Sequence, residues 1–215
     1  MKVLCVGYRN WAIEIYNNLK KIKKLKIVIH SKKKNLEDKI KKERPNVILF
    51  YGWSWIIKDN IVRNYNCFML HPSPLPKYRG GSPIQNQIIR GENKSAVTIF
   101  KMNNVLDGGD IYYQIKISLA GSLNEIFKRI VFYGTKGTIK VLTSKKLKIR
   151  KQDSKKVTFF KRRNPDQSEI TLKEIKNKSP DYIYNKIRML DDPYPNAYIK
   201  LKNGKKLYIK KFDIK

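Results

Sequence analysis

The sequence predicts an α/β fold, with a Rossmann-like, mostly parallel sheet, helices on both of its faces, and a small C-terminal α+β extension. Three observations predict it. Short, continuous apolar runs alternate with amphipathic runs in the first half, which is typical of parallel strands buried on both faces and separated by helices. The later segments change to alternating strand patterns and one long helical pattern. The length of 215 residues allows one substantial core and a small appendage.

Four strands and three helices are expected before the middle of the chain. The strands are the short apolar runs at 2–7, 25–30, 46–51 and 67–71. The helices are predicted at 11–20, at 36–44 before Pro45, and at 56–65. Gly7 stands alone after the first strand, without the GxGxxG spacing of a dinucleotide-binding turn. This turn therefore disfavours NAD chemistry.

The second half predicts a different arrangement. Strands are expected at 96–102 and 110–119, a helix at 124–142, an exposed hairpin at 147–160, a helix at 181–190, and two strands within 197–214. The last two strands flank Asn203-Gly204, a dipeptide that favours a tight hairpin turn. We expect a main domain over 1–163 and a small helix-and-hairpin subdomain over 164–215. The subdomain should dock on the main domain, because about fifty residues seldom fold alone.

The charge and the cysteines limit the class of protein. Lys and Arg number 48 against 17 Asp and Glu, a net charge of +31, which suggests a polyanionic partner. Lys, Ile and Asn are all frequent, however, as A/T-rich coding produces, so a solvated basic surface is an equal alternative. With no long apolar run and no signal-peptide pattern, a cytoplasmic protein without a membrane partner is expected. Cys5 and Cys67 lie in apolar runs, which predicts buried thiols and no metal site.

Two segments contain residues suited to catalysis. The first, His71–Gly81, reads HPSPLPKYRGG, and its prolines and glycines predict a rigid loop directly after a strand. Its histidine stands at the carboxyl end of that strand, where ligands bind in open α/β sheets. The second, Asn103–Asp110, reads NNVLDGGD, either an ordinary β-turn or a loop whose glycines let backbone approach a ligand. Neither segment alone decides between structure and function.

Together the two segments, with SPIQNQIIRGE and VTIFKM between them, resemble the 10-formyltetrahydrofolate-dependent formyltransferases. This family includes methionyl-tRNA formyltransferase, glycinamide ribonucleotide transformylase and the sugar N-formyltransferases. The resemblance is strong over residues 46–114 and weaker over 182–198, where the chain reads YIYNKIRMLDDPYPNAY. It implies an enzyme that moves a formyl group from 10-formyltetrahydrofolate to a primary amine.

The resemblance also implies roles for individual residues. His71 would transfer protons, and Asp107 would hold the imidazole in one tautomer, favour its charged form and position a water. Residues matching the family's folate site are Trp53, Ser54, Trp55, Ser73, Leu75, Pro76, Asn103, Asn104, Val105 and Leu106. Trp53 and Trp55 fit packing beneath the following helix equally well.

One position departs from the family pattern. Met69 stands two residues before the histidine, where the family usually has an asparagine that donates a hydrogen bond to the developing oxyanion. Methionine cannot donate, and losing one such donor costs about 10²- to 10³-fold in rate. Three explanations stay open. An imidazolium at His71 is the donor, another side chain such as Gln85, Ser73 or Asn104 replaces it, or the protein is a weakened or non-catalytic relative that binds folate or nucleic acid.

The short tail most resembles that of sugar N-formyltransferases, so the expected acceptor is an amino sugar carried on a nucleotide. Arg9, Lys77, Tyr78 and Arg79 are the residues expected to meet its phosphates. The alternative acceptor is methionyl-tRNA, which the high positive charge favours. Whether the protein forms a homodimer stays open.

Overall fold

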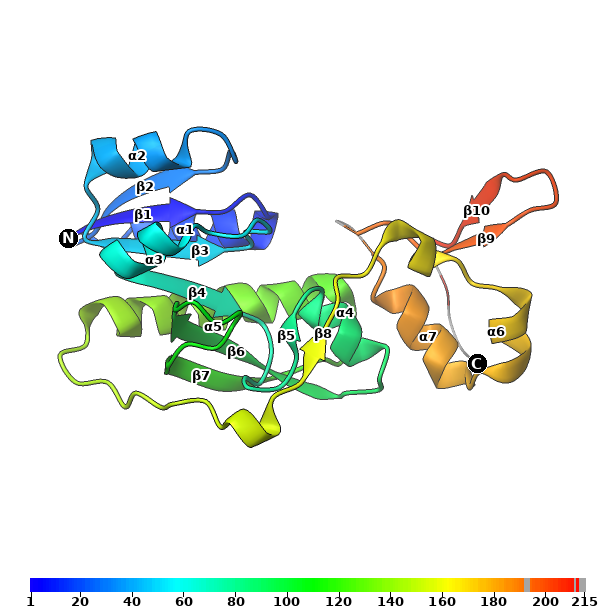
Figure 1. Ribbon diagram of the computed structural model, residues 1–215. Coiled ribbons are helices and arrows are strands. Elements are labelled where there is room, and N and C mark those ends of the chain that lie inside the picture. Colours follow the sequence, from blue (N-terminus) through cyan, green and yellow to red (C-terminus); the bar gives the residue numbers. More distant parts are fainter. Residues whose placement is uncertain (192–193, 211, 213–215) are drawn as a thin grey trace.

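The computed structural model describes residues 1–191, 194–210 and 212. Six strands form the main sheet in the order β2-β1-β3-β4-β6-β7 (Figure 1). Their bounds are β1 Lys2–Val6, β2 Lys26–His30, β3 Val47–Tyr51, β4 Cys67–His71, β6 Lys94–Lys101 and β7 Ile111–Ser118. The first four strands pair in parallel, whereas β4 with β6 and β6 with β7 pair antiparallel. The predicted mostly parallel α/β fold is confirmed.

Helices cover both faces of this sheet, as the sequence predicts. Helices α1 (Asn10–Lys20) and α5 (Leu123–Thr143) pack on one face, and α2 (Leu36–Glu43) and α3 (Asp59–Asn64) contribute to the core on the other. Strand β1 shows why both faces are apolar. Val3 and Cys5 join the first hydrophobic cluster, and Leu4 and Val6 join the second, because successive side chains of a strand point to opposite faces.

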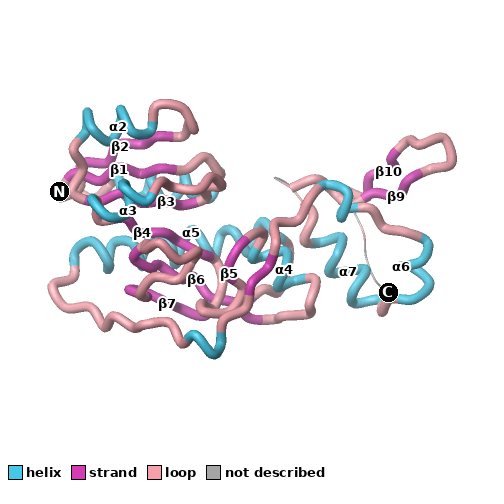
Figure 2. Tube along the Cα trace, in the orientation of Figure 1, coloured by secondary structure: helices cyan, strands magenta, loops and turns pink. Residues whose placement is uncertain are grey.

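The expected hairpin at 147–160 is wrong. This segment is a strap that crosses the main domain, shown as loop along most of its length in Figure 2. Arg150 forms an isolated antiparallel bridge with Ile111, and β8 (Phe159–Phe160) pairs in parallel with β5 (Arg79–Gly80). A short 3-10 turn, η1 (Ser154–Lys156), lies between the two contacts. The strap pairs with distant segments and not with itself, and local alternation of side chains cannot distinguish these two outcomes.

The C-terminal part contains η2 (Pro165–Ser168), α6 (Leu172–Asn177), α7 (Pro180–Arg188), β9 (Tyr198–Lys200) and β10 (Lys206–Tyr208). Strands β9 and β10 pair antiparallel around the predicted turn, with Gly204 at a φ of 80°. Helix α6 is absent from the sequence prediction. The predicted second strand runs to Ile214, and its last residues, 211, 213 and 214, lie outside the described residues.

The C-terminal part docks on the main domain through an apolar core and one buried arginine. Met189 and Ala197 are buried within the same hydrophobic cluster as α1 and α5. Arg188 is 9% exposed and donates hydrogen bonds to the carbonyls of Leu119 at 2.8 Å and Gly121 at 3.2 Å. The residues that join the C-terminal part to the main domain are therefore part of the hydrophobic core.

Two smaller findings concern composition. Cys5 and Cys67 are free, buried cysteines, and burial raises the pKa of the Cys67 thiol to about 12. Among the described residues, none of the helices combines the length and apolar character needed to cross a membrane, and no group of metal-ligating side chains was found.

Candidate active site

A large cleft opens where the ends of β3 and β4 meet the strap and the C-terminal part. Its volume is about 850 Å³, within the range of small-molecule sites. The main domain contributes His71, Asp107 and the loop after β3, and the C-terminal part contributes Leu190, Tyr194 and Pro195. The cleft is thus closed by two parts of the chain that are far apart in sequence.

Strand β4 places the histidine at the cleft. Met69 and His71 are two residues apart and share one face of the strand, while Phe68 and Leu70 pack into the cluster on the other face. Both Met69 and His71 line the cleft, and His71 is only 5% exposed. The histidine is therefore largely shielded from bulk water but open toward the cleft.

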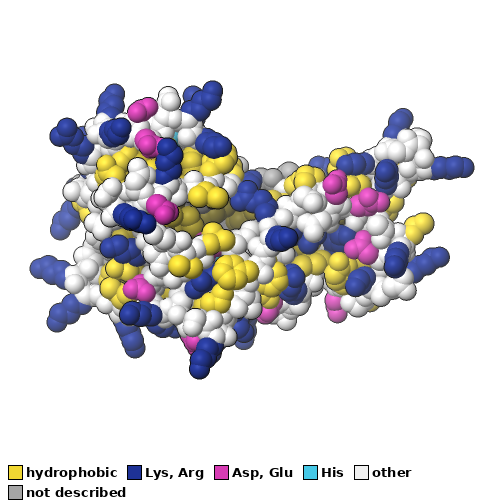
Figure 3. Space-filling model, in the orientation of Figure 1, with side chains coloured by type: hydrophobic (Ala, Val, Ile, Leu, Met, Phe, Trp, Pro, Cys, Tyr) yellow, Lys and Arg dark blue, Asp and Glu magenta, His cyan; other side chains and the backbone are white. Residues whose placement is uncertain are grey.

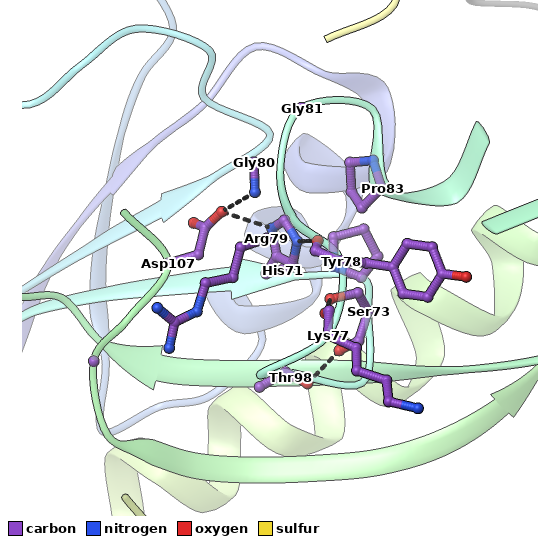
Figure 4. Close-up of polar contacts among 12 residues, drawn as sticks. His71, Ser73, Lys77, Tyr78, Arg79, Gly80, Gly81, Pro83, Thr98 and Asp107 are labelled. Atoms are coloured by element: carbon purple, nitrogen blue, oxygen red, sulfur yellow. Dashed lines mark hydrogen bonds and ion pairs between the residues drawn. The ribbon is translucent and has the colours of Figure 1, made fainter. Parts of the chain in front are cut away.

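Backbone and carboxylate groups hold the imidazole on opposite sides (Figure 4). His71 Nε2 lies 2.7 Å from the carbonyl oxygen of Tyr78, and Nδ1 lies 3.7 Å from Asp107 Oδ2. A carbonyl oxygen can only accept, so Nε2 must carry the proton, and Nδ1 has a free lone pair in the neutral ring. The predicted role of Asp107 in selecting the tautomer is corrected accordingly, because the Tyr78 carbonyl already selects it.

The loop that carries Asp107 follows β6 and must fold back along the sheet to reach His71. Strand β6 runs antiparallel to β4, with Thr98 beside His71 and Lys101 beside Phe68. The loop after β6 therefore leaves the sheet where β4 begins and must fold back. Gly109 permits the return, since an added Cβ there would lie 1.7 Å from the Lys101 carbonyl oxygen.

The carboxylate itself is fixed by the loop that follows β4. The Gly80 N–H donates to Asp107 Oδ2 at 2.8 Å (Figure 4). Asp107 is 7% exposed and adopts a φ of 50°, a left-handed conformation that aspartate tolerates better than most residues. The same oxygen thus faces both a backbone donor and His71.

Gln152 of the strap supports the Asp107 loop, a role that no sequence motif indicates. Its Nε2 donates to the carbonyls of Asp107 at 2.8 Å and Gly109 at 2.7 Å, and its Oε1 accepts from Arg79 Nη2 at 2.7 Å. Burial lowers the pKa of Arg79, and the nearby Asp107 carboxylate opposes that shift. No local motif marks Gln152, because its partners lie far away in sequence.

An aromatic wall lines the cleft beside the end of β3. Trp53 and Trp55 have ring centroids 4.6 Å apart, and Tyr8 lies 4.9 Å from Trp55. The Tyr8 hydroxyl donates to Ser54 Oγ, and the Arg9 guanidinium lies 5.1 Å above the Tyr8 ring. Trp53, Ser54, Trp55 and Arg9 all line the cleft. In addition, Trp53 packs against the second hydrophobic cluster, so packing describes part of its contacts. Its contact with folate stays a prediction.

The other predicted folate residues take different positions. Ser73 is fully buried and donates to the Lys77 carbonyl, and Leu75 packs with Phe100 and Ile111. Ser73 and Leu75 thus help to hold the loop after β4 in place. Neither of them, nor Pro76, is among the described residues lining the cleft.

The Asn103–Leu106 segment is exposed along its length. Leu106, 62% exposed, lines the cleft, whereas Asn103, Asn104 and Val105 are not among the described lining residues.

Of the four predicted acceptor residues, the structure brings Arg9 to the cleft. Lys77 is exposed elsewhere on the loop. Tyr78 and Arg79 are 7% and 6% exposed and are engaged in internal hydrogen bonds, which does not fit direct contact with substrate phosphates. The sequence prediction missed a different basic group, Lys161, Arg162 and Arg163, which follow the strap directly and line the cleft.

A folate-sized ligand fits the chemistry of this cleft. The aromatic wall offers flat apolar surface, and the Nε1 of Trp53 is buried without a hydrogen-bond partner among the described atoms. Buried polar atoms are nearly always paired in proteins. A ring system with hydrogen-bonding edges would satisfy both features.

Comparison with known proteins agrees with the geometry. Residues 14–142 match the family model described as Formyl transferase, and residues 165–210 match the one described as Methionyl-tRNA formyltransferase, C-terminal domain. The methionyl-tRNA formyltransferase of Ehrlichia canis (strain Jake) is 33% identical over 180 residues, which are 81% of this chain and 56% of that protein. The chain thus spans little more than half the length of this relative.

Two solved structures illustrate the range of similarity. A methionyl-tRNA formyltransferase from Clostridium thermocellum superposes with a TM-score of 0.83 and 34% identity, covering 97% of both chains. A sugar N-formyltransferase from Shewanella sp FDAARGOS_354 gives a TM-score of 0.74 at 18% identity, covering 98% of this chain and 96% of that one, a likeness of fold alone. With its cleft, its His71–Asp107 pair and these matches, the chain belongs to the formyl transferase family.

Proposed function

We propose that the chain transfers a formyl group to the amino group of methionyl-tRNA, the acceptor that the sequence analysis kept as the alternative. The observation that carries this proposal is the match of residues 165–210 to the methionyl-tRNA formyltransferase C-terminal domain. The family uses 10-formyltetrahydrofolate, which supplies an activated formyl group on nitrogen. We also propose the domain division at 163/164, with the cleft between the two parts.

In this proposal His71 is the base and Asp107 stabilises its charged form. An amine that attacks a formyl carbon must lose a proton, and Nδ1 of the neutral imidazole is the free acceptor because Nε2–H is bound to the Tyr78 carbonyl. Once Nδ1 is protonated, it faces the Asp107 carboxylate at 3.7 Å. His71 then returns the proton to the leaving nitrogen. Such proton transfer contributes about 10²- to 10⁴-fold in rate.

The folate would lie along the aromatic wall of Trp53, Ser54 and Trp55, with Leu106 beside it. Contact by Ser73, Leu75, Pro76 and residues 103–105 remains a proposal from the family resemblance. The acceptor would enter past the end of the strap, where the next three residues, Lys161, Arg162 and Arg163, line the cleft with cationic side chains. Cations at that edge suit the phosphates of an RNA end.

The central test is His71→Asn with His30→Asn as a matched control. His30 is the other of the two histidines and is not among the described residues lining the cleft. We expect His71→Asn to lower kcat by at least about 10²-fold while binding of folate persists. His30→Asn should keep its turnover. Unchanged turnover in His71→Asn would exclude the proposed base.

The acceptor is tested with the intact chain, 10-formyltetrahydrofolate and two sets of acceptors. Formylation of methionyl-tRNA, with binding that weakens steeply as salt rises, is the expected result. Lys and Arg side chains are spread over the whole visible face in Figure 3, so the slope should reflect several phosphate contacts. No reaction with methionyl-tRNA would reject this acceptor.

A second candidate acceptor is a nucleotide-linked amino sugar. The observation that favours it is that the Shewanella sugar N-formyltransferase covers nearly the whole of both chains. A panel of nucleotide-linked amino sugars, followed by mass spectrometry for the gain of one formyl group, distinguishes the two acceptors. A mass gain in the sugars alone would replace methionyl-tRNA by this candidate.

A further inference from the structure

The side chain of Gln85 is the most unusual polar group in the cleft outside the His71–Asp107 pair. It lies in α4 (Pro83–Ile88), lines the cleft and is only 2% exposed. Both of its amide atoms, Nε2 and Oε1, lack a hydrogen-bond partner among the described residues. A buried amide left unpaired destabilises the folded protein. The described residues offer the Gln85 amide no hydrogen bond that would offset this loss of stability.

In the neighbouring Gln87 only Oε1 lacks a hydrogen-bond partner among the described residues, whereas both amide atoms of Gln85 lack one. Gln87 is fully buried, and its Nε2 donates to the carbonyls of Pro72 at 3.0 Å and Pro83 at 2.9 Å. That side chain ties α4 to the loop after β4. Gln85 is buried to nearly the same degree, but it faces the cleft without any such tie.

The other three oxyanion donors that the sequence suggests, Ser73, Asn104 and His71, are engaged elsewhere or lie away from the cleft. Ser73 Oγ donates to the Lys77 carbonyl. Asn104 is exposed and is not among the described lining residues. Met69 lines the cleft beside His71 but offers no N–H or O–H. The third candidate, His71, has its Nε2–H occupied by the Tyr78 carbonyl, which leaves only a protonated Nδ1 as a donor.

We propose that Gln85 donates its amide N–H to the substrate's formyl oxygen and stabilises the negative charge that develops there. This inference rests on the proposed formyl transfer. As the amine nitrogen bonds to the formyl carbon, the carbonyl electron pair moves onto the oxygen, where Gln85 Nε2–H holds it. The amine proton goes to His71 Nδ1. The oxygen pair then reforms the carbonyl, the bond to the folate nitrogen breaks, and that nitrogen takes the proton from His71.

The Gln85 amide can also bind the attacking amine. Its Oε1 is a free acceptor in the same position, so it can accept from an N–H of the attacking amine while Nε2 donates to the oxygen. One side chain would then contact both the formyl oxygen and the attacking amine nitrogen. A methionine at position 69 becomes tolerable because the donor comes from α4 and not from β4.

The test compares Gln85→Leu with wild type and with Gln87→Leu. We expect Gln85→Leu to lower kcat by about 10²- to 10³-fold with little change in KM for 10-formyltetrahydrofolate. Its thermal unfolding temperature should stay the same or rise, because an unpaired amide is removed. Gln87→Leu should lower the unfolding temperature, since two carbonyls lose their donor. A drop in unfolding temperature for Gln85→Leu would assign it a structural role and overturn the proposal.

A second readout does not depend on turnover. The infrared stretch of a ¹³C-labelled formyl group in bound 5-formyltetrahydrofolate, an unreactive isomer, should shift to lower frequency in wild type and Gln87→Leu but not in Gln85→Leu.

The double variant Met69→Asn/Gln85→Leu should regain part of the lost kcat, because asparagine restores a donor on β4. An unmoved stretch, or turnover in Gln85→Leu within about threefold of wild type, overturns the inference.

Failure of the proposed function gives a different result. A wild-type chain that transfers no formyl group to any acceptor rejects the proposed function. The formyl stretch still reports whether Gln85 contacts the formyl oxygen, so the two failures can be told apart.

Discussion

Replacing Gln152 by methionine should loosen the loop that carries Asp107. The change keeps the length of the side chain and removes its donors and acceptor. Two N–H···O=C bonds, to the Asp107 and Gly109 carbonyls, contribute about 1 kcal/mol each, and the bond from Arg79 to Oε1 contributes about 2 kcal/mol because its donor is charged. Neighbouring bonds are not additive, so we expect a loss of about 3 kcal/mol in the free energy of unfolding.

The effect on turnover should follow from the position of Asp107. The Gln152 side chain bonds to the Asp107 loop and to Arg79, so its expected effect on His71 is through the position of that loop. A displacement of about 1 Å at a catalytic group can cost about 10²-fold, so kcat should fall by about 10- to 100-fold, more than KM changes. Urea unfolding and steady-state formyl transfer measure the two effects. Lys151→Met, at the exposed neighbouring position, is the control. An unfolding free energy within about 1 kcal/mol of wild type would refute the argument.

Two further predictions concern packing and pH. Gly7→Ala should lower the unfolding free energy by about 2–3 kcal/mol because its Cβ would lie 2.0 Å from the Tyr51 carbonyl oxygen. In the same urea titration Gly91→Ala, whose Cβ would meet no atom within 4 Å, should cost only about 1 kcal/mol, the strain of its φ of 76°. Burial raises the pKa of Glu174, but hydrogen bonds, first from Lys186, outweigh it and hold the pKa below its ordinary 4.5. The ion pair therefore stabilises the fold above pH 4.5 and is lost as the pH falls through the lower folded-state pKa. Glu174→Gln should show a flatter fall in melting temperature over that acid range, and an unchanged slope would contradict the assignment.

Periodicity was enough to predict most of the sheet and its covering helices. The apolar runs at β1, β3 and β4 are buried on both faces, and such runs leave little choice of structure. Helix α6 was missed because its six residues are all unburied, so no apolar stripe marks it. The strap was mistaken for a hairpin because the partner of Phe159 is Arg79, eighty positions earlier in the chain.

The candidate site was predictable only where a motif names its residues. His71 and Asp107 stand in recognisable segments, and the structure brings them within 3.7 Å. No local motif marks Gln152 or the cationic residues 161–163 that follow the strap, since their roles depend on how distant segments meet. Tyr78 and Arg79 were assigned to a substrate because they are basic or polar in a loop, but burial turns both of them toward the protein.

The loop after β4 holds the two central side chains entirely through main-chain atoms. The Tyr78 carbonyl accepts from His71, and the Gly80 N–H donates to Asp107, so neither contact depends on which side chain those two positions carry. The constraint is instead on the path of the chain, where Tyr78 has a φ of 61° and Gly80 a φ of 93°. Replacement at Gly80 should therefore be limited by the backbone itself, because its φ is left-handed and a Cβ there would lie 2.4 Å from the Phe160 carbonyl oxygen. The alignment of His71 with the Asp107 carboxylate thus depends on the conformation of the backbone, which a search for catalytic side chains does not detect.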